Sequence, residues 1–202
     1  MQSTSMGRAA FDHARFLAAA RALVSERGPA GATVDAVIER LHAPKGSFYY
    51  RFASRDALLG ELWLETVLAY QEGFVAAIAR GDGLAAALHT TNWVRDNLDE
   101  GRLLLLYNRE DFVQGSWPAS LRRGVRDQAE RFEGCLRTFA RQAFGRTRPE
   151  HLRRAAFVLV EIPVTAVKPH LKRREPPPPL VDELIALTYR AIVGSHPAVA
   201  PP

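Results

Sequence analysis

Hydrophobic residues recur every three or four positions along most of this chain, and no stretch alternates apolar and polar residues as a strand would. A spacing of three or four places side chains on one face of an α-helix. The pattern therefore predicts an all-α protein without a sheet. We expect nine helices, at residues 11–27, 33–41, a short one directly after Pro44, 55–80, 84–99, 102–114, 118–144, 149–171 and 180–193.

Capping and helix-breaking residues separate these predicted helices. Gly28-Pro29 ends the first helix, and Thr33 stands at the N-cap of the second. Pro44 fixes φ for the start of the third helix and keeps Ala43 out of the helical region. Ser54 caps the long fourth helix, which at 1.5 Å per residue would be roughly 35–40 Å long. Pro176 to Pro179 predicts an extended link before the last helix.

Basic residues are concentrated at the N-terminal end of the chain. Residues 1–55 hold eight Lys/Arg and four Asp/Glu, a net charge of +4, whereas residues 56–202 hold nineteen and eighteen, a net charge of +1. A basic end on a near-neutral remainder is typical of a nucleic-acid-binding module. We expect a disordered N-terminus at 1–10, a DNA-binding domain at 11–55, a larger helical domain at 56–195 and a disordered tail at 196–202.

The composition gives no sign of secretion, membrane insertion or metal binding. Cys135 is the only cysteine, so no intrachain disulfide can form. The longest apolar stretch, Ala155 to Val167, contains Glu161 and Pro163, and it falls short of the roughly 20 residues that a membrane span needs. The six histidines lack metal-ligand spacing, and no nucleophile–base pair is recognisable. We expect a soluble, cytoplasmic protein that is not an enzyme, with no membrane partner, no cofactor and no metal site.

The second and third predicted helices carry the residues that indicate function. Phe48 and Phe52 are four apart and would pack inward, together with one apolar face of the preceding helix. The outward positions of the third helix then carry a charge and several hydroxyl groups, on Lys45, Ser47, Tyr49, Tyr50 and Arg51. Gly46 would let the backbone approach a phosphate, and Thr33 would offer a hydroxyl at a helix N-terminus. Two short helices of this kind indicate a helix-turn-helix whose second helix enters a major groove.

Residues 11–60 resemble the N-terminal domain of the tetracycline-repressor (TetR) family of transcriptional regulators. The matching segments are Glu26-Arg-Gly, Thr33-Val, Glu39-Arg, Lys45-Gly-Ser-Phe-Tyr-Tyr-Arg-Phe and Ser54-Arg-Asp-Ala-Leu-Leu. The resemblance implies phosphate contacts from Thr33, Lys45, Tyr49, Arg51 and Arg55, with Ser47 and Tyr50 nearest the base edges.

Three positions depart from the family pattern. His42 replaces the usual turn glycine, and Pro44 stands where a capping serine is common. Arg51 stands where the family often has histidine, so this position carries a positive charge at any pH.

Beyond residue 60 the resemblance concerns architecture only. It implies a helical domain that forms a homodimer and encloses a pocket for a small-molecule effector. Apolar stripes along 149–171 and 180–193 would supply two helices per subunit to a four-helix bundle. Aromatic residues with a few polar ones could line a pocket for an apolar or aromatic ligand. The candidates are Trp63, Tyr70, His89, Asn92, Trp93, Tyr107, Phe112 and Glu161.

The sequence is thus interpreted as a homodimeric DNA-binding transcriptional regulator, a repressor that leaves a palindromic operator in double-stranded DNA when an effector binds. Two alternatives stay open at this point. One is a helical enzyme or lipid-binding protein with a vestigial DNA-binding module. The other is a regulator without a small ligand, controlled by a protein partner.

Overall fold

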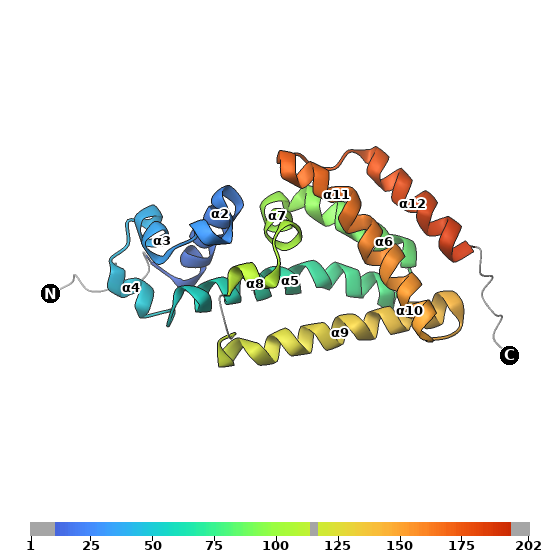
Figure 1. The fold of residues 1–202 in the computed structure, drawn as a ribbon, viewed down its shortest axis with the longest axis horizontal. Helices are drawn as coiled ribbons and strands as arrows, with labels where there is room; N and C mark the ends of the chain where they lie inside the picture. Colours follow the sequence, from blue (N-terminus) through green and yellow to red (C-terminus); the bar gives the residue numbers. More distant parts are fainter. Residues whose placement is uncertain (1–10, 114–116, 195–202) are drawn as a thin grey trace.

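The computed structural model describes residues 11–113 and 117–194, in which every regular element is a helix (Figure 1). The all-α prediction is confirmed for this part of the chain. The described residues form ten helices when α10, η1 and α11 are counted as one, against nine expected. The segments predicted to be disordered, 1–10 and 196–202, lie outside the described residues.

Three helices form the N-terminal end: α2 (His13–Gly31), α3 (Val34–Leu41) and α4 (Lys45–Tyr49). The first was expected from residue 11, but Asp12 is its N-cap and accepts a hydrogen bond from the Arg15 N–H at 2.8 Å. Gly28 has φ 76° and breaks the helix where the sequence predicted, although one further turn continues to residue 31. Both α3 boundaries were predicted correctly, because Thr33 caps the helix as expected.

Two long helices span the molecule. α5 (Arg55–Ala79) begins at Ser54, whose hydroxyl oxygen accepts a hydrogen bond from the Ala57 N–H at 3.0 Å. α9 (Ala119–Phe144) packs along it and runs in the same direction (Figure 1). α5 thus extends from the three N-terminal helices to the opposite end of the larger domain.

The connection between these long helices differs from the prediction. The structure has α6 (Gly83–Asp96), α7 (Leu98–Leu106) and α8 (Arg109–Phe112), where helices at 84–99 and 102–114 were expected. Asn108 forms a capping box with Asp111, in which the Asn108 N–H donates to the carboxylate at 2.6 Å. Because asparagine favours caps over helix interiors, residue 108 starts a new helix instead of continuing α7.

The predicted helix 149–171 is continuous but not uniform. It consists of α10 (Pro149–Ala156), a π-helical turn η1 (Phe157–Glu161) and α11 (Ile162–Arg173). Pro163 has no N–H for the carbonyl four residues earlier, and its ring pushes that carbonyl away. The π-helical turn next to it is a common way to absorb such a defect. The final helix, α12 (Pro179–Gly194), follows the extended proline segment, as predicted.

Two hydrophobic clusters fill the interior. The first joins α2, α3 and α4 to the first half of α5 and to parts of α7, α8 and α9. The second joins the far half of α5 to α6, the end of α9, α10–α11 and α12. The first cluster contains residues from both sides of position 55, so the N-terminal helices pack directly against the larger domain. The domain boundary at 55 stays a prediction.

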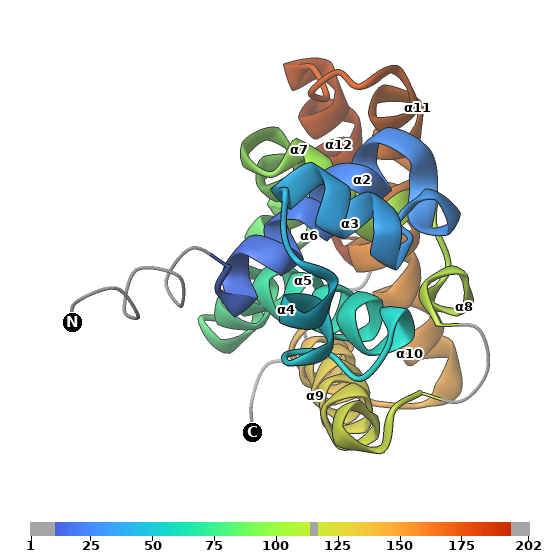
Figure 2. The same ribbon diagram turned by 90° about the vertical axis from the view of Figure 1, so that its left-hand side faces the viewer.

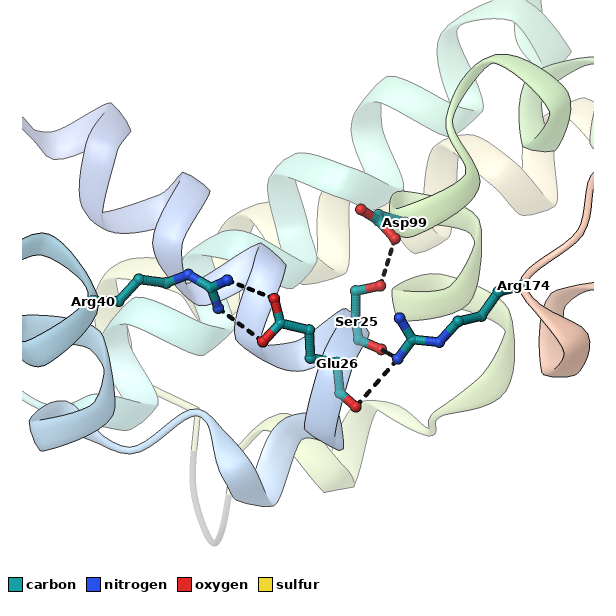
Figure 3. A network of polar contacts seen from close by, with 5 residues as sticks. All are labelled: Ser25, Glu26, Arg40, Asp99 and Arg174. Carbon is teal, nitrogen blue, oxygen red and sulfur yellow. Dashed lines mark hydrogen bonds and ion pairs between the residues drawn. The ribbon is translucent and has the colours of Figure 1, made fainter.

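Arginines from the larger domain bind the end of α2. The Ser25 carbonyl would normally accept from the N–H of residue 29, but residue 29 is proline and has none. Arg174 Nη2 donates to the Ser25 carbonyl at 2.9 Å, and Arg102 Nη2 donates to the same oxygen at 3.3 Å. Arg174 Nη2 also reaches the Glu26 carbonyl at 3.2 Å (Figure 3). Arginines that are distant in sequence therefore supply the hydrogen bonds that Pro29 cannot donate to the Ser25 carbonyl.

The same network reaches the helix-turn-helix. The Ser25 hydroxyl donates to Asp99 in α7 at 2.5 Å. The Glu26 carboxylate accepts two hydrogen bonds from Arg40 in α3, at 2.5 and 3.0 Å (Figure 3). The hydrogen-bonded Arg40 guanidinium holds the pKa of the Glu26 carboxyl below its ordinary value. α2 is thus connected to α7 and α11 on one side and to α3 on the other.

This network predicts non-additive losses of stability. Arg102→Met or Arg174→Met alone leaves the Ser25 carbonyl with one donor, whereas the double variant leaves this buried oxygen without an arginine donor. We expect the double variant to lose about 1 kcal/mol more unfolding free energy than the sum of the two single losses. Urea denaturation followed by circular dichroism measures the unfolding free energies of the wild type, the two single variants and the double variant. Strictly additive losses would show that the two arginines do not act together on this carbonyl.

Candidate nucleic-acid interface

The helix-turn-helix lies at one end of the molecule, and Figure 2 looks onto this end, with α3 and α4 toward the viewer. α4 is only five residues long and depends on tertiary packing. Phe48 and Phe52 are buried, and their rings lie 5.8 and 6.0 Å from that of Phe16 in α2. These contacts fix which face of α4 points outward.

The turn between α3 and α4 keeps the backbone conformation that glycine would adopt easily. His42 has φ 51°, in the left-handed region. The His42 N–H donates to the Glu39 carbonyl and the Ala43 N–H donates to the Ile38 carbonyl, which ends α3. Pro44 offers no side-chain cap to α4. In its place Ser47 uses both its N–H and its hydroxyl to donate to the Pro44 carbonyl, at 2.9 and 2.6 Å. The two departures from the family pattern are thus accommodated locally.

The outward face of α4 carries two exposed phenol rings and one exposed ammonium group. Tyr49 is 52% exposed and Tyr50 is 75% exposed. Lys45 is also exposed and forms an ion pair with Asp35 of α3 at 3.1 Å. The hydrogen bond to Asp35 raises the pKa of Lys45. Because all three side chains are exposed, they are accessible to a ligand.

Gly46 leaves open space on the same helix. A Cβ built at this residue would meet no protein atom within 4 Å. The absence of a side chain here is therefore not required by the fold. It is consistent with an approach of the backbone to something outside the protein.

Thr33 and Arg51, two more of the residues predicted to contact phosphates, also have intramolecular partners. The Thr33 hydroxyl oxygen accepts from the Ala36 N–H at 3.1 Å. Arg51 donates to the Ser47 carbonyl at 3.0 Å, and its guanidinium lies over the Tyr50 ring at 5.6 Å. The phosphate contacts proposed for these residues stay predictions.

Arg55 is the most extensively bound of the predicted residues. It is half-buried and donates to the Ala32 carbonyl at 3.1 Å, the Pro29 carbonyl at 2.6 Å and the Asp56 carboxylate at 3.0 Å. It therefore holds the connection between α2 and α3 in place. This structural role was not predicted, because the carbonyls it binds are set by the tertiary fold.

The predicted ligand-binding residues do not converge on one site. Tyr70, His89 and Trp93 lie together: the Tyr70 ring is 5.1 Å from that of His89 and 5.3 Å from that of Trp93. The Tyr70 hydroxyl is hydrogen-bonded to Thr90 at 2.8 Å, and His89 Nε2 contacts the Tyr70 carbonyl at 2.6 Å. Burial lowers the pKa of His89, which favours the neutral ring.

The other five candidates lie elsewhere. Trp63 packs edge-on against Trp117, and Tyr107 packs edge-on against Phe112; all four belong to the first hydrophobic cluster or its rim. The Asn92 amide oxygen accepts from Arg95 at 3.1 Å on the surface. Glu161 is ion-paired with Arg153. Glu161 lies in an otherwise apolar stretch of the predicted helix 149–171, and its ion-pair partner is an arginine of the same chain.

The described residues were also searched for metal-binding clusters and membrane-spanning helices. Among them, no group of three or more His, Cys, Asp or Glu residues is arranged to hold a metal ion. None of the helices at 13–112 and 119–194 is long and apolar enough to cross a membrane.

The chain was compared with known proteins. The family described as "Bacterial regulatory proteins, tetR family" matches residues 16–62, which cover α2 to the first part of α5. No curated protein matches the chain. Among solved structures, the chain resembles a protein from Mesorhizobium loti MAFF303099 described as a TetR-family transcriptional regulator, at a TM-score of 0.52 and 16% identity, over 94% of this chain and 98% of that one. Residues 16–62 thus match the regulatory domain of the TetR family, and the described residues share the fold of that solved TetR-family protein, a helix-turn-helix domain followed by a larger helical domain.

Proposed function

We propose that this regulator is a repressor that binds a palindromic operator as a homodimer and leaves it when a small effector binds. The observation that supports the DNA-binding mode is the outward face of α4. Lys45, Tyr49 and Tyr50 are exposed there, and Gly46 leaves the backbone accessible. Lys45 and Tyr49 would bind phosphates, and Tyr50 would lie nearest the base edges.

Binding selection from a random duplex pool tests this proposal directly. We expect the wild-type protein to enrich a palindrome and the Lys45→Ala/Tyr49→Ala variant to lose it. Loss of the Lys45 phosphate contact should also reduce the slope of log affinity against log salt by about 0.9. If neither protein enriches any sequence, the sequence-specific repressor proposal is wrong.

Gly46→Ala separates DNA binding from stability. The added methyl group meets no protein atom within 4 Å, so we expect unchanged or slightly higher stability, by up to about 1 kcal/mol from helix propensity. Affinity for the selected operator should fall about tenfold, because the methyl group blocks a backbone–phosphate contact. Fluorescence anisotropy measures the affinity. Gly134→Ala in α9 is the matched control, since its Cβ also meets no protein atom within 4 Å; equal affinities for both variants would contradict the close approach.

Asp35 competes with DNA for Lys45. Asp35→Asn removes the carboxylate that pairs with the Lys45 ammonium at 3.1 Å. We expect operator affinity to rise a few-fold at low salt, roughly the value of an exposed ion pair. Glu39→Gln removes an exposed carboxylate of the same helix that has no ion pair among the described residues. An equal rise in both variants would indicate a general charge effect instead of release of Lys45.

The proposed dimer would use an exposed apolar face of α12. Leu180, Leu184 and Leu187 are 58%, 54% and 60% exposed and follow a helical spacing of four and three. Val181 and Ile185, part of the stripe predicted for the bundle, are buried within their own protomer. The surface left for a second copy is therefore the leucine face, with the exposed Phe157 on the neighbouring η1.

Charging this face tests the dimer. Leu184→Glu/Leu187→Glu places two carboxylates on largely exposed positions, so the protomer should stay folded while the dimer dissociates. Light scattering coupled to size exclusion measures the mass. Leu68→Glu in α5, another exposed leucine, is the control and should leave the mass unchanged. A dimer of unchanged affinity in the double variant would exclude this face as the interface.

The effector would act by changing the spacing of the two recognition helices, which must match successive major grooves about 34 Å apart. Of the predicted ligand residues, Tyr70, His89 and Trp93 form a group of three rings that the described structure brings together in the larger domain. We propose that an apolar or aromatic effector would contact this group. Free and effector-bound structures with the same recognition-helix spacing would contradict the proposed mechanism.

A further inference from the structure

A second cationic feature lies away from the outward face of α4. A cleft of about 710 Å³ lies where α8 and the start of α9 approach each other. Four arginines contribute to its lining, together with one indole ring and a valine. They are Arg109, Arg122, Arg123 and Arg126, with Trp117 and Val125.

The positive charge of this cleft is largely uncompensated. Arg109 pairs with Glu110 at 3.1 Å. Within the described chain, no ion pair is found for Arg122, Arg123 or Arg126. Asp127 and Glu130 stand four residues after two of these arginines, a spacing that permits helix ion pairs, yet no such pair forms. Several guanidinium groups are therefore available to an anion in the cleft.

The cleft also has an aromatic wall that is held in place. The Trp117 ring packs edge-on against Trp63 of α5, with ring centroids 5.2 Å apart. A Cβ built on Gly60 would lie 3.2 Å from this ring, so α5 supports it closely. The Arg109 guanidinium lies 5.9 Å from the centroid of the Trp117 ring. The Trp117 ring is partly exposed and lines the cleft, so a flat ligand would meet its exposed part beside cationic groups.

We propose that this cleft binds an organic anion that combines an aromatic ring with a phosphate or carboxylate group. Its volume lies within the range of roughly 300–1,000 Å³ that is typical of small-molecule sites. Guanidinium groups bind phosphate and carboxylate oxygens in pairs, and they stack on flat rings. DNA backbone binding would use the charge but has no need of the indole wall. The proposal does not depend on the repressor function of the chain.

The position of the cleft gives such a ligand a route to the DNA-binding end. Trp117 and Val125 pack in or against the first hydrophobic cluster, which also contains Phe16, Phe48 and Phe52. A ligand that bridges α8 and α9 would thus bind to elements that share a core with the helix-turn-helix. The cleft is distinct from the Tyr70, His89 and Trp93 group, which lies farther along α5.

Calorimetric titration of the full-length protein tests the proposal with defined probes. 1-Naphthyl phosphate and 1-naphthoate supply ring and charge, 1-naphthol supplies the ring alone, and inorganic phosphate supplies the charge alone. We expect the two naphthyl anions to bind at least about tenfold more tightly than either half-probe, because only they use both parts of the cleft. The better of the two anions distinguishes a phosphate ligand from a carboxylate ligand.

Matched variants locate the binding site. Arg122→Gln/Arg126→Gln should weaken naphthyl phosphate binding about tenfold or more, whereas Arg131→Gln/Arg141→Gln, the same charge change elsewhere on α9, should leave it unchanged. Thermal unfolding checks that all variants fold. Absence of binding, equal binding of 1-naphthol, or equal losses in both variants would overturn the proposal.

A parallel titration with the selected operator tests whether the cleft binds the DNA backbone instead. If naphthyl phosphate does not bind and Arg122→Gln/Arg126→Gln weakens operator binding, the cleft is a DNA-backbone contact and the small-anion proposal is wrong. If no operator is found at all, the naphthyl titrations still show whether the cleft binds a small aromatic anion. Failure of the repressor proposal and failure of this one are therefore distinguishable.

Discussion

A single backbone defect determines how the two parts of this molecule are joined. Pro29 deprives the Ser25 carbonyl of its helical donor, and Ser25 is buried. A buried carbonyl without a donor costs about 1–3 kcal/mol, so another group must supply the hydrogen bond. Arg102 and Arg174 supply it from α7 and from the end of α11. The end of α2 is therefore satisfied only when the larger domain is packed against it.

Arginine binds the opposite side of the same segment. Arg55 at the start of α5 donates to the carbonyls of Pro29 and Ala32, which lie between α2 and α3. The connection that begins the helix-turn-helix is thus held by guanidinium groups from three separate helices or their ends. Arg55 differs in this respect from Lys45, which is ion-paired only with an exposed carboxylate of α3 within the described residues. Arg55 thus holds the connection between α2 and α3, whereas Lys45 is the cation that we propose for phosphate binding.

The sequence predicted most clearly what local chemistry decides. Thr33 and Ser54 begin α3 and α5 where expected, because a capping hydroxyl acts within three residues. Phe48 and Phe52 face inward, because their spacing fixes a helix face. Contacts between distant residues were not predictable in the same way. The spread of the ligand candidates and the binding of Arg55 to the Pro29 and Ala32 carbonyls depend on how helices pack. The capping box at Asn108 is a local signal that hydrophobic spacing alone does not reveal.

The packing limits how an effector could act on DNA binding. Phe16, Phe48 and Phe52 join α2 to α4 so closely that α4 cannot shift alone without opening a cavity in the first hydrophobic cluster. A change in recognition-helix position must therefore move α2, α3 and α4 together. Such a movement would require the arginine–carbonyl bonds at the end of α2 to lengthen or exchange partners. Hydrogen bonds of this kind can be exchanged at a smaller cost than a packed aromatic cluster, so we expect the change to occur at the contacts of Arg102 and Arg174 with the end of α2 and not within the helix-turn-helix.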